Sequence, residues 1–100
     1  MLKTWTAKLW NNDARETKAP KLDVESADER QAATTALAHF AATDEFISKD
    51  GYVALTVPDV DREYRFTVAE ILDWATNSPD GIAFVNSDPM LSALGTLELQ

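Results

Sequence analysis

The fold of this chain is decided by residues 26–42, which have the sequence SADERQAATTALAHFAA. Ser26 and Glu29 have the spacing of a capping box, in which each side chain accepts a hydrogen bond from the other residue's backbone amide. Apolar residues then recur at helical spacing: Ala33, Ala36, Leu37, Phe40 and Ala41. Because this stripe is mostly alanine, we expect a helix that packs closely against a sheet.

Two strands are predicted before this helix. From Leu2 to Trp10 the chain alternates, with Trp5, Ala7 and Leu9 on one face, as in a half-buried strand. Residues 11–18 are polar and predict a loop. Residues 21–25 alternate again, so a second strand that pairs with the first is expected.

Three further strands and a second helix are predicted in the middle of the chain. Asp50-Gly51 lies between residues 45–49 and 52–57 and has the composition of a two-residue hairpin turn. A strand over residues 63–66 follows. Thr67 and Glu70 form a second capping box, and Phe66 and Ile71 have the spacing of a hydrophobic staple, so a helix is expected over residues 68–76.

The last quarter of the chain predicts shorter elements. Residues 82–85 are wholly apolar and indicate a buried strand, and Asp88-Pro89 indicates a short helix that ends at Gly95. Residues 96–99 alternate and are expected to close the sheet. The prediction for residues 1–100 is a single α+β domain. It has a small antiparallel sheet of about four to six strands, with two main helices (about 27–42 and 68–76) packed on one face.

Composition limits the classes of protein that this chain can belong to. Of the 100 residues, 45% are hydrophobic, which is ordinary for a globular domain and argues against disorder. There is no cysteine, which excludes a disulfide framework, a zinc–thiolate site and a thiol nucleophile. No run is long and apolar enough to span a membrane. We therefore expect a soluble, cytoplasmic protein with no membrane association.

Charge is distributed unevenly along the chain. The net charge is −8, and Arg65 is the last basic residue, with five carboxylates after it. A polarised acidic chain favours a basic partner and repels nucleic acid, so direct nucleic-acid binding is not expected.

Catalytic and metal-binding signals are weak. The single histidine, His39, is predicted on the polar flank of the first helix, where no neighbouring residue completes a catalytic relay. Asp59, Asp61, Glu63 and Glu70 match positions 1, 3, 5 and 12 of a calcium loop, but Tyr64 stands where that loop needs glycine. We predict no enzyme activity, no cofactor and no metal site, with a weak divalent-cation site at 59–70 as an alternative.

The candidate partner-binding residues are carboxylates near the predicted helix starts, together with one tryptophan. They are Asp23, Glu25, Asp28, Asp59, Asp61, Glu63, Glu70, Asp73 and Trp74. Trp74 is predicted about 110° from the buried stripe of its helix, by 100° per residue, so it is either an interface anchor or a ring folded over the edge of the core. The carboxylates either imitate a row of phosphates or serve only solubility and helix capping.

These features carry a resemblance to a class of proteins. The strand-hairpin opening (2–25), the capped alanine-rich helix (26–42) and the compact, carboxylate-rich remainder resemble small acidic proteins of phages and mobile elements, among which anti-CRISPR and other anti-defence proteins are best known. The resemblance implies a non-catalytic inhibitor in the bacterial host. It would bind a basic, nucleic-acid-binding surface of a host complex, by nucleic-acid mimicry or steric block. A phage structural protein that self-associates is the alternative.

Overall fold

The computed structural model describes residues 2–11, 19–43, 47–58 and 60–96. Four strands, three α-helices and one 3-10 helix follow one another along the chain. They are β1 (Lys3–Trp10), β2 (Lys21–Ser26), α1 (Glu29–Ala42), β3 (Tyr52–Val57), β4 (Val60–Thr67), α2 (Val68–Asn77), α3 (Pro79–Asn86) and η1 (Pro89–Thr96). None of the helices in the described residues is long and apolar enough to cross a membrane.

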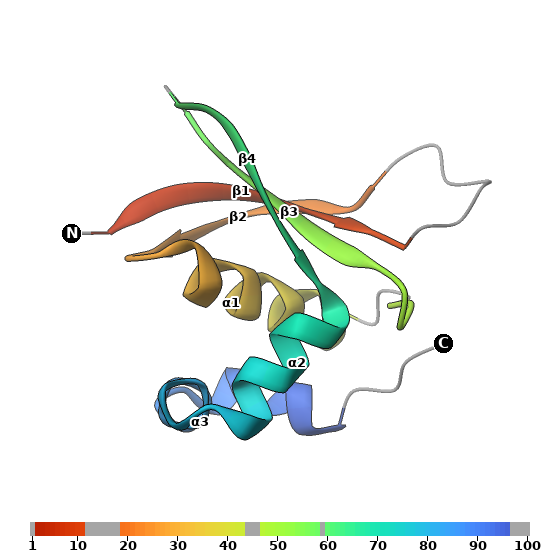
Figure 1. The fold of residues 1–100 in the computed structure, drawn as a ribbon, viewed down its shortest axis with the longest axis vertical. Helices are drawn as coiled ribbons and strands as arrows, with labels where there is room; N and C mark the ends of the chain where they lie inside the picture. Colours follow the sequence, from red (N-terminus) through yellow and green to blue (C-terminus); the bar gives the residue numbers. More distant parts are fainter. Residues whose placement is uncertain (1, 12–18, 44–46, 59, 97–100) are drawn as a thin grey trace.

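The four strands form one antiparallel sheet in the order β2-β1-β3-β4. The chain therefore makes two β-hairpin–helix units in succession, and β1 and β3 pair at the centre. All the helices lie on one side of the sheet, with α1 directly beneath it and α2, α3 and η1 beneath α1 (Figure 1). The α+β class and the antiparallel sheet are confirmed.

The inner face of the sheet is the one predicted for the first strand. Trp5, Ala7 and Leu9 are all buried, and Trp5 is only 2% exposed. The indole N–H of Trp5 donates to the Ser26 carbonyl at 3.1 Å, and its ring meets Tyr64 edge-on at a centroid distance of 5.7 Å. The buried tryptophan therefore has its polar atom satisfied, as burial requires.

Helix α1 begins later than the sequence predicts. Its N-cap is Asp28, whose Oδ1 accepts from the Gln31 amide at 2.8 Å. Ser26 is instead the last residue of β2, opposite Lys3, and its buried hydroxyl donates to the Asp28 carbonyl. The predicted cap at Ser26 was wrong because two non-helical residues, Ala27 and Asp28, separate it from the first residue of α1, and its hydroxyl bonds to the Asp28 carbonyl instead.

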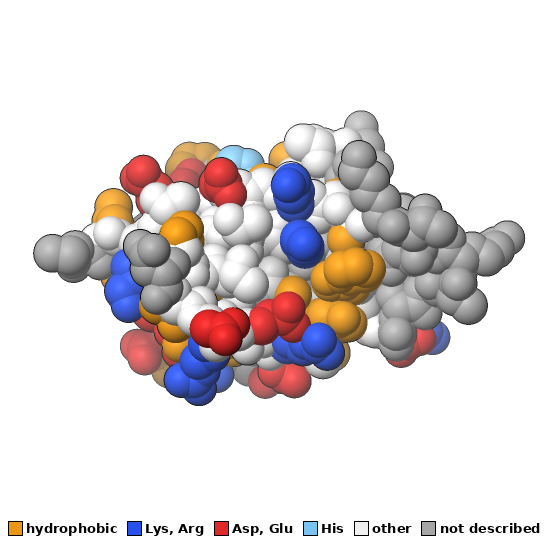
Figure 2. Space-filling view, turned by 90° about the horizontal axis from the view of Figure 1, so that it is seen from above, with side chains coloured by type: hydrophobic (Ala, Val, Ile, Leu, Met, Phe, Trp, Pro, Cys, Tyr) orange, Lys and Arg blue, Asp and Glu red, His pale blue; other side chains and the backbone are white. Residues whose placement is uncertain are grey.

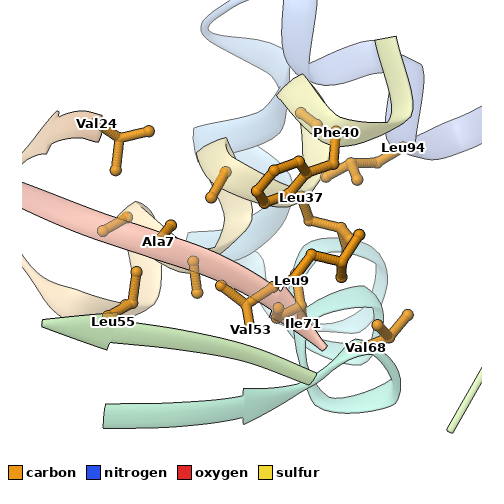
Figure 3. Packing of buried hydrophobic residues seen from close by; sticks show 14 of the residues in the cluster. Ala7, Leu9, Val24, Leu37, Phe40, Val53, Leu55, Val68, Ile71 and Leu94 are labelled. Carbon is orange, nitrogen blue, oxygen red and sulfur yellow. The ribbon is translucent and has the colours of Figure 1, made fainter. Parts of the chain in front are cut away.

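Helix α1 is buried on two sides. Besides most of the predicted stripe, Ala32, Thr34 and Ala38 are fully buried, and the Thr34 hydroxyl is satisfied by the Arg30 carbonyl at 2.9 Å. Helix α1 contacts η1 and α2 as well as the sheet, and Figure 3 shows Phe40 of α1 beside Leu94 of η1. Alanine permits both approaches because its side chain is small.

The predicted cap of α2 is confirmed, but the hairpin before it is not. The Thr67 hydroxyl accepts from the Glu70 amide at 3.0 Å. Residues 47–49 form no strand, and residues 45–46 lie outside the described residues. Tyr52 begins β3, which makes its hairpin with β4. Gly51 is needed for close approach: a Cβ there would lie 2.6 Å from the Trp10 carbonyl oxygen.

Residues 79–96 form α3 and η1, which corrects another prediction. Residues 82–85 belong to α3 and not to a buried strand, because Ser78-Pro79 starts a helix with proline in its first turn. Ile82 is 40% exposed, so the apolar run is not buried throughout. The short helix after Asp88 is confirmed as η1, which includes Thr96. The rest of the predicted closing strand, residues 97–99, lies outside the described residues.

Candidate interaction surfaces

The structure distributes the predicted partner-binding residues over three places. Asp23 and Glu25 lie on edge strand β2, and Asp61 and Glu63 lie on the opposite edge strand, β4. Asp28, Glu70, Asp73 and Trp74 lie on the helical side. Asp59 lies outside the described residues. Two strands separate β2 from β4, so the two edge pairs are about 14 Å apart at the usual strand spacing and form no single row.

The outer face of the sheet has mixed charge. Figure 2 looks onto this face and shows acidic and basic side chains around a polar centre. The Thr6 hydroxyl donates to Asp23 at 3.0 Å, and Glu63 forms an ion pair with Arg65. The hydrogen bond to Glu63 raises the pKa of Arg65 above its ordinary value. Carboxylates with such partners are a poor imitation of a phosphate row.

Charge is instead segregated between the layers. The described residues of the four strands carry five cations and four carboxylates, a net of +1. The helical layer, which we define as residues 27–43 and 68–96, carries six carboxylates and one arginine among its described residues, a net of −5. The carboxylates are Asp28, Glu29, Glu70, Asp73, Asp80 and Asp88. The helical layer is therefore the acidic side of the described molecule.

Many of these carboxylates also serve the helices. Asp28 caps α1, and the Asp88 carboxylate accepts from the Met90 amide at 3.0 Å. Glu70 and Asp80 lie in the first turns of α2 and α3. Negative charge at a helix N-terminus is favourable because it opposes the positive end of the helix dipole. Local stability thus accounts for where these carboxylates lie, but not for the shortage of cations around them.

A groove of about 330 Å³ lies between the start of α1 and the side of α2. We call it the α1–α2 groove. Phe66 and Trp74 are aromatic residues in its wall, Ile71 contributes a buried apolar contact, and Glu70 and Asp73 line it with exposed carboxylates. Arg30, from α1, completes the lining together with Ser78. Three predicted site residues, Glu70, Asp73 and Trp74, are therefore brought together.

Trp74 lies at the edge of the core and also lines the α1–α2 groove. It is half-buried, and its ring packs on Phe84 of α3 with the centroids 5.9 Å apart. Gly81 lies directly against it, since a Cβ at Gly81 would lie 1.9 Å from the Trp74 carbonyl oxygen. The ring thus packs against α3 and still lines the α1–α2 groove.

Sequence reasoning missed Arg30. Its guanidinium carbon lies 6.0 Å from the ring centroids of both Phe66 and Trp74. These three residues are far apart in the chain, and only the packing of α1 beside α2 brings them together. An arginine in the first turn of a helix, where the dipole disfavours a cation, was the available signal.

The predicted calcium-loop spacing is not realised as a loop. Asp61 lies near the start of β4 and Glu70 in the first turn of α2, and Thr67 lies six residues beyond Asp61 along the extended strand. That strand spans about 20 Å at 3.3 Å per residue, so the two carboxylates cannot share an ion. No group of three potential metal ligands occurs within the described residues.

His39 lies half-buried in the last turn of α1. Comparison of the chain with protein-family models, with curated protein sequences and with solved structures gives no match.

Proposed function

We propose that this protein is a non-enzymatic interaction protein whose acidic helical layer binds a basic surface of a nucleic-acid-handling host complex. The observation that carries the proposal is the segregation of charge, with a net of −5 on the described helical layer and +1 on the described strands. A one-sided acidic surface steers the protein toward a basic partner and orients it on arrival.

The class of partner comes from the resemblance to small acidic anti-defence proteins. In that class the protein is an inhibitor of anti-CRISPR type, acting in the cytoplasm of a bacterial host. It occupies a basic nucleic-acid-binding groove, either as a mimic of the nucleic acid or as a steric block. The helical layer suits either mode, since its carboxylates Glu70, Asp73, Asp80 and Asp88 are all exposed.

The second candidate, a self-associating phage structural protein, is favoured by a different observation. No described helix covers the outer face of the sheet (Figure 1). Trp10 and Tyr52 are paired opposite each other in the β1–β3 ladder. An open sheet face with adjacent aromatic residues is a surface on which copies can stack. Sedimentation at micromolar concentration separates the candidates: a monomer contradicts the structural protein, and a ring or large oligomer supports it.

The experiment that tests the proposal is a capture from bacterial lysate with two matched variants. The helical variant combines Glu70→Gln, Asp73→Asn, Asp80→Asn and Asp88→Asn. The sheet variant combines Asp23→Asn, Glu25→Gln, Asp61→Asn and Glu63→Gln. Both remove four exposed carboxylates with near-isosteric amides, so they have the same net charge.

The proposal expects wild type and the sheet variant to capture the same protein, identified by mass spectrometry as a nucleic-acid-binding component of a defence complex. The helical variant is expected not to capture this protein. Added nucleic acid is expected to displace the captured protein from wild type. Equal capture by all three proteins would contradict the proposal, and so would loss with the sheet variant alone.

A further inference from the structure

The α1–α2 groove holds a cation that has no anionic partner. Arg30 is exposed, and among the described residues no carboxylate forms an ion pair or accepts a hydrogen bond from its guanidinium. Its contacts in the groove are with the rings of Phe66 and Trp74, at 6.0 Å each. Glu70 and Asp73 line the same groove, and neither takes Arg30 as an ion-pair partner.

These walls have the chemistry of a site for a cation. Aromatic faces attract cations through the negative charge of their π electrons, and guanidinium stacks well because it is planar and weakly hydrated. Carboxylates can receive a guanidinium through two parallel hydrogen bonds. The position of Arg30 shows that a guanidinium can lie beside both rings. Among the described residues Glu70 and Asp73 have no ion-pair partner, although Asp73 Oδ1 accepts a hydrogen bond from the Asn77 side-chain amide at 2.7 Å.

We propose that the α1–α2 groove receives an arginine side chain of the basic partner, and that Arg30 holds that place in the free protein. The incoming guanidinium stacks against Trp74 and Phe66 and pairs with Glu70 or Asp73, while the exposed Arg30 side chain turns out to solvent. This inference deepens the proposed function and rests on it for the source of the arginine.

Charge favours this occupant over an anion. The groove is lined by two carboxylates and one guanidinium, so its net charge is −1. It also belongs to the acidic helical layer, which repels anionic ligands. Lysine is disfavoured relative to arginine because its compact, strongly hydrated ammonium neither stacks nor pairs in two places.

The test titrates the protein with a short neutral peptide that contains one arginine, followed by the indole N–H signals in ¹H–¹⁵N spectra. The control peptides carry lysine or citrulline at the same position, and citrulline keeps the shape of arginine without its charge. The Trp74 signal is assigned with Trp74→Phe. The arginine peptide is expected to shift this signal saturably, the lysine peptide more weakly, and the citrulline peptide not at all.

Variants give the sharper result, because Arg30 is expected to compete with the ligand. Arg30→Gln should strengthen binding of the arginine peptide about threefold, as expected for one exposed charge. The double variant Glu70→Gln, Asp73→Asn should weaken binding of the arginine peptide about fivefold, because two exposed carboxylates are lost.

Two controls change charge equally outside the groove. Arg62→Gln removes a cation that stacks on Tyr64 at 4.7 Å, and Glu25→Gln removes an exposed carboxylate of β2. Both are expected to leave the affinity for the arginine peptide unchanged. Weaker binding in Arg30→Gln would overturn the proposal, because it would show that Arg30 is itself the recognition group for an anionic or neutral ligand. Equal shifts with arginine and citrulline, or no shift, would also overturn it.

Failure here is distinguishable from failure of the proposed function. If the protein captures a partner through its helical layer but the arginine peptide leaves Trp74 unaffected, the groove proposal is wrong and the function stands. If the peptide binds as described but the helical variant captures the same proteins as wild type, the function is wrong and only the arginine site stands.

Discussion

Single residues decide where the helices of this protein begin. Two acceptors, Ser26 and Asp28, precede α1, and both have the right chemistry for an N-cap. Only Asp28 caps the helix, because Ser26, the last residue of β2, is not adjacent to the first residue of α1. Thr67 is likewise the last residue of a strand, paired with Tyr52, but α2 begins at the very next residue, so its hydroxyl reaches the Glu70 amide and the sequence prediction is confirmed.

Replacing Asp28 tests this assignment. Asp28→Ala is expected to lower the free energy of unfolding by about 1 kcal/mol, because the Gln31 amide loses its acceptor. Asp28→Asn keeps an acceptor and should cost less. Ser26→Ala should cost about 0.5 kcal/mol, because the Asp28 carbonyl also accepts from the Ala32 amide. Urea unfolding measures the free energy of unfolding of all three variants. A larger loss of stability with Ser26→Ala than with Asp28→Ala would show that Ser26 is the N-cap.

At the scale of elements, α1 shows what a one-dimensional pattern can and cannot predict. The stripe through Ala33 and Leu37 indicated the face toward the sheet, and both residues are buried. The sequence did not indicate that Ala32 and Ala38, outside this stripe, are buried as well, because alanine is compatible with either solvent or core. Helix α1 also contacts α2 and η1, which reach it only in the folded molecule.

A larger side chain in α1 tests this double-sided packing. Ala38→Leu is expected to destabilise the fold by about 1–3 kcal/mol, because Ala38 is fully buried outside the predicted stripe and has no free space for three more carbons. Ala42→Leu, at the exposed end of the same helix, is the control and should change the stability by less than about 0.5 kcal/mol. If the two substitutions changed the stability equally in thermal unfolding, the buried alanine would have free space beside it and α1 would not be packed on that side.

The helix α3 shows a second limit. Residues 82–85 are apolar, and a short apolar run fits a buried strand or a helix equally well. The decisive signal was Ser78-Pro79 before the run, which starts α3. The contacts of Trp74 were harder still to predict from the sequence, since Gly81, Phe84 and Arg30 meet it only through tertiary packing.

For the whole molecule, the fold class and three of the groove residues were predictable, whereas the separation of charge by layer was not. The sequence showed that no cation follows Arg65, which already favoured an acidic surface. It also suggested Asp61 and Glu63 as part of that surface. The structure instead mixes these two with cations on the strands and leaves the helices with most of the uncompensated charge.

The most direct test of the proposed function is the rate at which the protein associates with its captured partner, measured across salt concentrations. We expect the helical variant to associate about tenfold more slowly than wild type at low salt, with the difference shrinking as salt rises, because the steering field is screened. The sheet variant, with the same net charge, should associate at close to the wild-type rate. If the two variants were slowed equally, or neither were slowed, the helical layer would not be the binding surface.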